Sequence, residues 1–181
     1  MKMRLLGYLC LCTGLAGSAA EHAMKASDVA GTSSFSSGLN WDDGQPPAAG
    51  NTYRTASYIL RTPEGTGGYV FAGDRLTINN GGTLAWKSTG PVTVADLVLE
   101  GTIGHWIGNL ANDAQLYGTI TIPGGATGRF ECSQTENDKR VFRIFAPITG
   151  SGNLQVTMGH TNVVKGVSIQ ADNSGFTGRV I

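Results

Sequence analysis

The chain has 181 residues, which is long enough for one domain with a substantial core. Basic and acidic residues balance at 13 each, charged residues make up only 14% of the chain, and glycine occurs 27 times, which excludes a charged disordered tail and argues against a helical protein. The basic residues form no cluster that would neutralise phosphates, so the sequence gives no support for nucleic-acid binding.

The first 20 residues have the features of a secretory signal peptide. Two basic residues lie among the first four, and an apolar stretch follows over residues 5–15. Ser18 and Ala20 fit the small-x-small rule of signal peptidase, which predicts cleavage before Glu21. The apolar stretch is shorter than the roughly 20 residues that a transmembrane helix needs. The alternative interpretation is a buried N-terminal helix.

Cysteine usage and glycosylation motifs bear on the compartment of the exported chain. Cleavage would remove Cys10 and Cys12, so Cys132 would remain alone and no internal disulfide could form. The sequence contains no Asn-x-Ser/Thr acceptor. We therefore expect a chain that is secreted or held at the cell surface of a bacterial envelope. After signal cleavage we expect no transmembrane segment.

The rest of the chain divides into three parts by composition. Residues 21–34 are small and polar, and we expect a lead-in there. Residues 35–68 contain several aromatic residues and the Pro46-Pro47 pair, and we expect them to form an N-terminal cap with the first coil. From residue 69 to residue 181, short apolar runs alternate with glycine-rich turns.

Apolar and polar residues alternate in many short segments, a pattern typical of strands with one buried face. The segments are 76–78, 84–86, 92–94, 97–99, 120–122, 142–148, 154–156 and 167–169. Between them, glycine and asparagine supply the positive φ that tight turns require. The best helical candidate is the stretch 107–115, which is weak because it carries Gly108 and two asparagines. The pattern predicts an all-β fold.

Internal similarity favours one all-β architecture. The segments "GDRLTI", "VADLVLEGTI" and "DAQLYGTITI" align Leu76, Leu97 and Leu116 at spacings of 21 and 19 residues. This period suits a parallel β-helix, in which coils stack about 4.8 Å apart. A β-sandwich or jelly roll is the alternative, since it also has many short strands. In the β-helix we expect these side chains to point inward: Leu76, Ile78, Leu97, Leu99, Ile120, Ile122, Ile144, Leu154, Val156 and Ile169.

Two motifs near the end of the chain carry a family resemblance. "ITGSGNLQV" (148–156) is close to the pattern I-x-G-x-G-x-L, and "NSGFTGRV" (173–180) is close to N-x-[FY]-[TS]-G. Over residues 33–181 the chain resembles the autotransporter-associated β-helical repeat proteins, which are exported bacterial proteins. The resemblance implies a right-handed parallel β-helix of the passenger type. Such passengers are normally longer, so we expect this chain to be a truncated N-terminal piece whose open last coil self-associates.

Carboxylates are the candidates for enzymatic chemistry, because carbohydrate-active β-helices place them with a basic residue on one face. Glycoside hydrolysis needs two carboxylates about 5–9.5 Å apart. The candidates are Asp42, Asp43, Asp74, Asp96, Glu100, Asp113 and the region 131–143 from Glu131 to Arg143. Asp74 and Asp96 precede aligned leucines and are expected near one corner of adjacent coils. We expect most of these carboxylates to solvate turns, and Asp42-Asp43 to form a turn because the spacing of calcium loops is absent.

Histidine, cysteine and tryptophan give weaker signals. No metal motif surrounds the histidines, so we expect surface or coil-edge positions for His22, His105 and His160. Cys132 is expected to pack as a small hydrophobe rather than act as a nucleophile. We expect Trp86 to face the core, Trp41 to help close the first coil, and Trp106 to have a core or cap role.

These observations predict a non-enzymatic structural or adhesive segment of an exported bacterial surface protein. No catalytic, cofactor-binding or metal site is expected. The expected partners are surface polysaccharide or other envelope and extracellular components. The alternatives are a carbohydrate-active β-helix of the polysaccharide lyase or hydrolase type, and a carbohydrate-binding module.

Overall fold

A computed structural model describes residues 19–105, 113–132, 141–158 and 166–181. The regular structure in these ranges is all β-strand, and each of the eight alternating segments expected from the sequence lies on or overlaps a strand. The strands are β1 (Ala20–Ala23), β2 (Asn51–Arg54), β3 (Ile59–Arg61), β4 (Tyr69–Val70), β5 (Arg75–Ile78), β6 (Thr83–Trp86), β7 (Pro91–Leu99), β8 (Thr102–His105), β9 (Ala114–Thr121), β10 (Thr127–Cys132), β11 (Val141–Ile144), β12 (Ile148–Thr149), β13 (Asn153–Met158), β14 (Gly166–Ile169) and β15 (Arg179–Val180).

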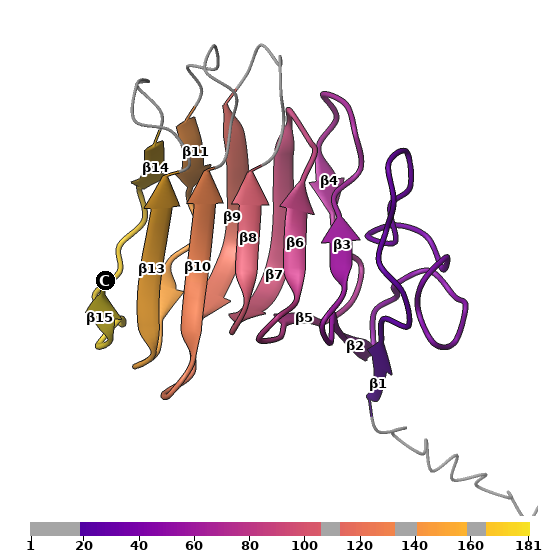
Figure 1. The fold of residues 1–181 in the computed structure, drawn as a ribbon, viewed down its shortest axis with the longest axis horizontal. Coiled ribbons are helices and arrows are strands. Elements are labelled where there is room, and N and C mark those ends of the chain that lie inside the picture. Colours follow the sequence, from indigo (N-terminus) through magenta and orange to yellow (C-terminus); the bar gives the residue numbers. More distant parts are fainter. Residues whose placement is uncertain (1–18, 106–112, 133–140, 159–165) are drawn as a thin grey trace, which may run out of the picture.

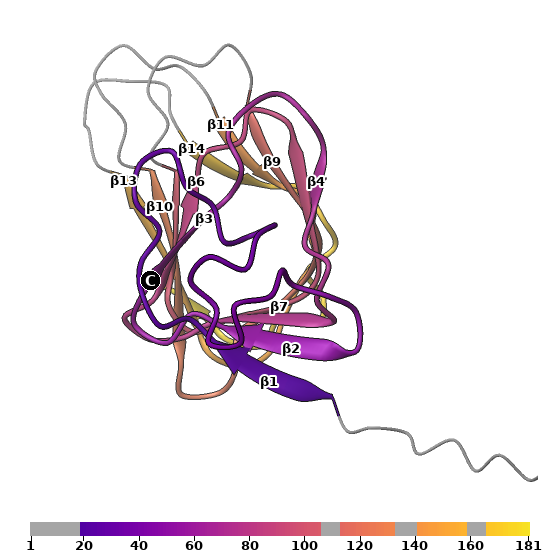
Figure 2. The same ribbon diagram turned by 90° about the vertical axis from the view of Figure 1, so that its right-hand side faces the viewer.

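The strands stack as successive coils of a parallel β-helix. One sheet has the order β1-β2-β5-β7-β9-β11-β14, with β4 beside β7 and β12 beside β9, and the other has the order β15-β13-β10-β8-β6-β3. Every pair of these strands is parallel, so the jelly-roll alternative, which needs antiparallel neighbours, is wrong. Figure 1 shows the arrows running side by side, and Figure 2 shows the coil from its N-terminal end. The stack contains about four turns.

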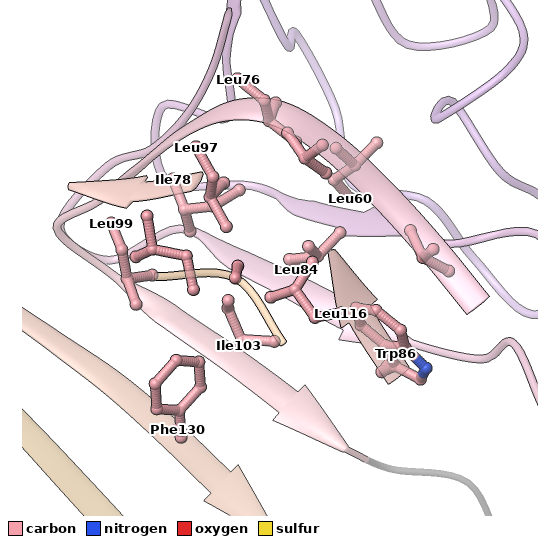
Figure 3. Packing of buried hydrophobic residues seen from close by; sticks show 14 of the residues in the cluster. Leu60, Leu76, Ile78, Leu84, Trp86, Leu97, Leu99, Ile103, Leu116 and Phe130 are labelled. Atoms are coloured by element: carbon pink, nitrogen blue, oxygen red, sulfur yellow. The ribbon is translucent and has the colours of Figure 1, made fainter. Parts of the chain in front are cut away.

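Parallel pairing in register places inward side chains in columns. Leu76 pairs with Leu97, Leu97 with Ile120, and Ile120 with Ile148. A second column lies on the facing sheet, where pairing joins Leu60, Leu84, Ile103 and Phe130 (Figure 3). The prediction of the core is confirmed for eight side chains that are fully or almost fully buried: Leu76, Ile78, Leu97, Leu99, Ile120, Ile122, Ile144 and Leu154.

The expected alignment of Leu116 with Leu76 and Leu97 is wrong. Leu116 pairs with Val92, and the partner of Leu97 is Ile120. The register shifts between Val94 and Leu97, where β7 passes from one side of the coil to the next. Gly118 lies opposite this shift with a φ of 108°, and a Cβ there would come 1.7 Å from the carbonyl oxygen of Val94. Only glycine fits this bend, and similarity between segments does not detect it.

Two of the residues expected to point inward are less buried than the others. Ile169 is 38% exposed, and Val156 is only partly buried. Ile169 lies on β14, the end strand of its sheet, so Ile144 covers it on one side, and no strand of the described residues pairs with its other side. Val156 pairs with Phe130, but β15 reaches only the first two residues of β13. Ile169 therefore lies in the inward column but is not buried.

Self-association through the last coil stays a prediction, which sedimentation velocity would check.

Aromatic side chains close the N-terminal end of the stack. Trp41 is fully buried, its ring lies 4.9 Å from that of Tyr53, and its Nε1 donates to the carbonyl oxygen of Ser34. Phe71 packs edge-on against Tyr53 at 5.4 Å and against Phe35 at 5.2 Å. Such pairs contribute about 0.5–1.5 kcal/mol each beyond the burial of their area. The prediction that Trp41 helps close the first coil is confirmed.

A buried carboxylate fixes the loops of this cap. Asp28 is 5% exposed and accepts four hydrogen bonds. Its Oδ2 accepts from the backbone N–H groups of Ser34 and Arg61, and its Oδ1 accepts from the Ser34 hydroxyl and the Asn40 amide. A buried carboxylate is stable only when its lone pairs are satisfied in this way. Asp28 therefore joins the segment 21–34 to the strand β3.

Trp86 is fully buried, as predicted, and Cys132 is 2% exposed and packs with the core. The helical candidate 107–115 lies mostly outside the described residues, but Ala114 and Gln115 belong to β9. Within the described ranges, the chain contains no helix with the length and apolar character needed to cross a bilayer.

Truncation to alanine should lower the free energy of unfolding by different amounts at two positions of the same column, Ile144 and Ile169. We expect Ile144→Ala to lower the free energy of unfolding by about 2–5 kcal/mol, because it leaves a cavity between packed coils. Ile169→Ala, one coil further along the same column, should cost less than about 1.5 kcal/mol, because Ile169 is already partly in water. Urea denaturation of both variants measures the difference. Equal costs would mean that the column is not the unit of packing.

Candidate functional site

Charged side chains on the outer face of the coil pair between neighbouring strands. Arg54 Nε lies 3.1 Å from Glu21 Oε2, which joins β2 to β1. Arg75 Nε lies 2.7 Å from Asp96 Oδ2, which joins β5 to β7, and Arg143 on β11 contacts Asp113, which lies just before β9, at 2.6 Å. These pairs are solvent-accessible, so each contributes about 0–1 kcal/mol to stability.

The carboxylates expected to share a corner of adjacent coils do not form a catalytic pair. Asp96 is bound to Arg75, whereas Asp74 accepts a hydrogen bond from the backbone N–H of Gly50 at 2.9 Å. Neither carboxylate is among the lining residues of the cavity beside Glu100 or of the one between Gly31 and Pro46. Asp113 pairs with Arg143, and residues 133–140 of the candidate region 131–143 lie outside the described residues.

Glu100 borders a cavity of about 340 Å³ at the turns between coils. The cavity is lined by Asn80, Glu100, Arg129 and the turn 123–127. Glu100 Oε2 lies 3.3 Å from the amide nitrogen of Asn79, and Arg129 Nε donates to Gln155 at 2.9 Å. The cavity thus presents one carboxylate and one guanidinium, with no second carboxylate among its lining residues.

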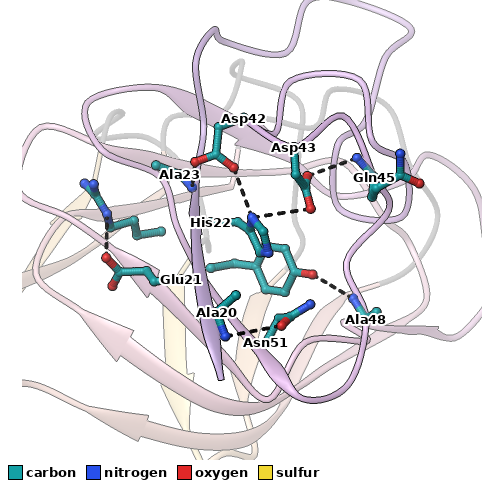
Figure 4. Close-up of polar contacts among 11 residues, drawn as sticks. Ala20, Glu21, His22, Ala23, Asp42, Asp43, Gln45, Ala48 and Asn51 are labelled. Atoms are coloured by element: carbon teal, nitrogen blue, oxygen red, sulfur yellow. Dashed lines mark hydrogen bonds and ion pairs between the residues drawn. The ribbon is translucent and has the colours of Figure 1, made fainter. Parts of the chain in front are cut away.

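The N-terminal end of the stack brings together one histidine and two aspartates (Figure 4). Parallel pairing of β1 with β2 places His22 in register with Tyr53, and their rings lie 5.4 Å apart. The turn after the buried Trp41 brings Asp42 and Asp43 over the same ring. His22 Nδ1 lies 3.1 Å from Asp42 Oδ1 and 3.3 Å from Asp43 Oδ2. In the described ranges, these are the only three His, Cys, Asp or Glu residues whose ligand atoms lie within 4.8 Å of one another.

Backbone hydrogen bonds hold both carboxylates in this orientation. Asp42 Oδ2 accepts from the N–H of Ala23 at 3.1 Å, and the N–H of Asp42 donates to the carbonyl oxygen of Ala23 at 3.0 Å. Asp43 Oδ1 accepts from the N–H of Gln45 at 3.0 Å. Each aspartate therefore uses one oxygen to fix the turn and directs the other oxygen at His22 Nδ1.

The contacts within the cluster lower the pKa of Asp42. Burial raises this pKa, but the hydrogen bonds from Ala23 and His22 outweigh that effect and hold the pKa below its ordinary value. In the described part of the chain, no Lys or Arg ion pair is formed by Asp42 or Asp43. The only positive charge that can face these two carboxylates from within the cluster is therefore a protonated His22.

The remaining sequence candidates are the turn at Asp42-Asp43, the three histidines and Trp106. The prediction that Asp42-Asp43 form a turn is confirmed. His22 was expected at the surface or at a coil edge, and it lies on β1, the end strand of its sheet, where it contacts both aspartates. His105 ends β8, and Trp106 and His160 lie outside the described residues. The cluster links residues 20 positions apart through loops without periodicity, so no local signal could have found it.

Comparison with known proteins adds no relative. No protein-family model, no curated protein and no solved structure matches the chain.

The lowered pKa of Asp42 predicts a pH dependence of stability. A carboxyl group whose pKa is lowered in the folded state adds stability above its unfolded pKa, about 3.9, and loses it as the pH falls through the folded value. Asp42→Asn keeps an oxygen for the Ala23 N–H group. We expect the difference in unfolding free energy between wild type and this variant to shrink between about pH 5 and pH 2. Urea denaturation at stepwise pH measures it, and a constant difference would contradict the assignment.

Proposed function

We propose that this chain is a non-enzymatic structural or adhesive segment of an exported bacterial surface protein, of the kind found in autotransporter-associated β-helical passengers. One observation carries the proposal: two of the candidate carboxylates, Asp96 and Asp113, are each bound to an arginine of a neighbouring coil, Arg75 and Arg143. Ion pairs of this kind add to the strand hydrogen bonds that join each coil to its neighbours, which suits a structural role.

The fold itself suits this role. All strand pairing is between successive coils, so further coils add length without changing the packing of those already formed. The outward faces then present a regular array of polar side chains along one direction. We propose surface polysaccharide or other envelope and extracellular components as the partners of such an array, and the cell surface or the medium as its location.

A carbohydrate-active β-helix is the second candidate function. It is supported by the cavity beside Glu100 and Arg129, which combines a carboxylate and a guanidinium at about 340 Å³. Cleavage of an acidic polysaccharide would need a base or acid and a cation to bind the uronate, and this pair supplies one of each. It lacks the second carboxylate that the usual glycoside hydrolase mechanism requires.

Incubation with a panel of acidic and neutral polysaccharides, with and without calcium, separates the two functions. We expect no release of reducing ends, because a single carboxylate borders the cavity. We also expect no unsaturated ends, because Glu100 contacts the Asn79 amide and Arg129 donates to Gln155. Glu100→Gln is the matched variant, since it keeps the size of the side chain and removes its charge. Cleavage by the wild-type chain that is abolished in Glu100→Gln would replace the structural proposal with the enzymatic one.

Export is tested by the N-terminus of the protein recovered from cells. We expect mass spectrometry of protein from the envelope or the medium to give a chain that begins at Glu21, because Ser18 and Ala20 fit signal peptidase. Ala20→Pro should block processing and leave the longer form as the control. An intact Met1 on a chain confined to the cytoplasm would contradict the location that we propose.

A further inference from the structure

His22 occupies a column position that later coils fill with apolar side chains. It pairs with Tyr53, which pairs with Leu76, and the column continues through Leu97 and Ile120. Apolar residues suit these positions because each is covered by the coil on either side. His22 is at the end of the column, with a side chain only 17% exposed, so one ring nitrogen with strong ligand properties lies at the boundary between the core and solvent.

His22 Nδ1 has two carboxylate oxygens near it, which is more than a single hydrogen bond would use. Nδ1 of an imidazole carries at most one proton, yet the oxygens of Asp42 and Asp43 both face it at 3.1 and 3.3 Å. Charge-assisted N–H···O⁻ bonds are shorter, about 2.7–2.9 Å. Without that proton, the nitrogen lone pair would face two anionic oxygens. A single cation between the three atoms would satisfy all of them at once.

The distances fit the coordination sphere of a small divalent metal ion. Zinc binds imidazole nitrogen and carboxylate oxygen at about 2.0–2.2 Å, and two ligands of a tetrahedral ion at that radius lie about 3.3–3.6 Å apart. The two nitrogen–oxygen separations of 3.1 and 3.3 Å are near this spacing before any side chain moves. The backbone bonds to Ala23 and Gln45 already hold one oxygen of each carboxylate, which leaves the other available.

We propose that His22 Nδ1, Asp42 Oδ1 and Asp43 Oδ2 bind one divalent transition-metal ion, of the class of Zn²⁺. With a neutral imidazole the three side chains carry a charge of −2, which a divalent ion balances. Nitrogen with two carboxylates suits Zn²⁺ and its neighbours in the first row, whereas Ca²⁺ takes six to eight oxygen ligands. Asp42 is 48% exposed, so water can complete the coordination.

The bound ion would fasten the first strand to the cap. His22 lies on β1 and the aspartates lie on the turn that follows Trp41. The ion therefore joins two segments that otherwise meet through hydrogen bonds, such as those between Ala23 and Asp42, and through the Met24–Trp41 bridge. An ion that binds the folded chain and not the unfolded one stabilises it in proportion to the logarithm of its concentration over its dissociation constant. The metal site is independent of the role proposed for the outer faces of the coil.

Calorimetric titration with Zn²⁺ tests the site. The uncleaved chain should be used without a polyhistidine tag, so that neither a tag nor an amino terminus at Glu21, next to His22, supplies a ligand. Bound metal should first be removed with EDTA. We expect one ion per chain and a melting temperature that rises with Zn²⁺ concentration. In two-bond ¹H–¹⁵N spectra of the imidazole rings, the Nδ1 resonance of His22 should shift on binding, which distinguishes it from His105 and His160.

Matched variants separate a metal ligand from a structural residue. Gln at position 22 can still donate hydrogen bonds to both carboxylates, and Asn at position 43 can still accept from Gln45, so His22→Gln and Asp43→Asn should fold. Each should weaken Zn²⁺ binding by at least roughly 10–100-fold. Asp74→Asn is the control, because Asp74 also accepts a backbone hydrogen bond, from Gly50, and its loss removes the same charge outside the cluster. Its affinity should equal that of the wild type.

Three outcomes would overturn the proposal. The first is an absence of saturable Zn²⁺ binding, which would leave a shared proton as the occupant of the cluster. The second is binding of the same strength in wild type, His22→Gln and Asp43→Asn. The third is binding that leaves the Nδ1 resonance of His22 unchanged and shifts that of another histidine, which would place the ion elsewhere.

Discussion

Parallel, in-register stacking of the coils is the constraint on which the rest of the structure depends. Each strand bonds to the corresponding strand of the next coil, so a residue lies over its counterpart there and not over its neighbours in sequence. Leu97 is buried because Leu76 and Ile120 lie on either side of it. Among the described strands, Ile169 has a partner on one side only, and it is exposed. Burial in this fold is decided by position in a column more than by local sequence.

The same stacking distributes the charged side chains. Where strands run in register, outward residues of opposite charge meet across neighbouring coils, as Arg75 and Asp96 do. Groups engaged in this way are held apart from one another along the stack and cannot converge on a ligand. Convergence therefore occurs where the ladder is interrupted, at the turns beside Glu100 and at the N-terminal end around His22.

Much of the coil could be predicted from the sequence, because alternation with period two and glycine-rich turns are local signals. The pairing of Leu76 with Leu97 could also be predicted, since their segments are similar. Leu116 could not be placed, because the bulge opposite Gly118 shifts the register without changing the local pattern. The strand β10 was missed for a related reason: its inward positions are Gly128, Phe130 and Cys132, which do not give a clear apolar alternation.

The N-terminal end was the least predictable part, because its contacts are set by loops that have no period. Asp28 reaches Arg61 across 33 residues, and His22 reaches Asp42 across 20. The pairing of β1 with β2 decides both the place of His22 in the inner column and its position over the turn. The same strand pairing therefore closes this end of the fold and places His22 beside the two aspartates. An ion bound between the imidazole and the two carboxylates would hold the first strand to the turn after Trp41, while the β1–β2 ladder joins that strand to the next coil.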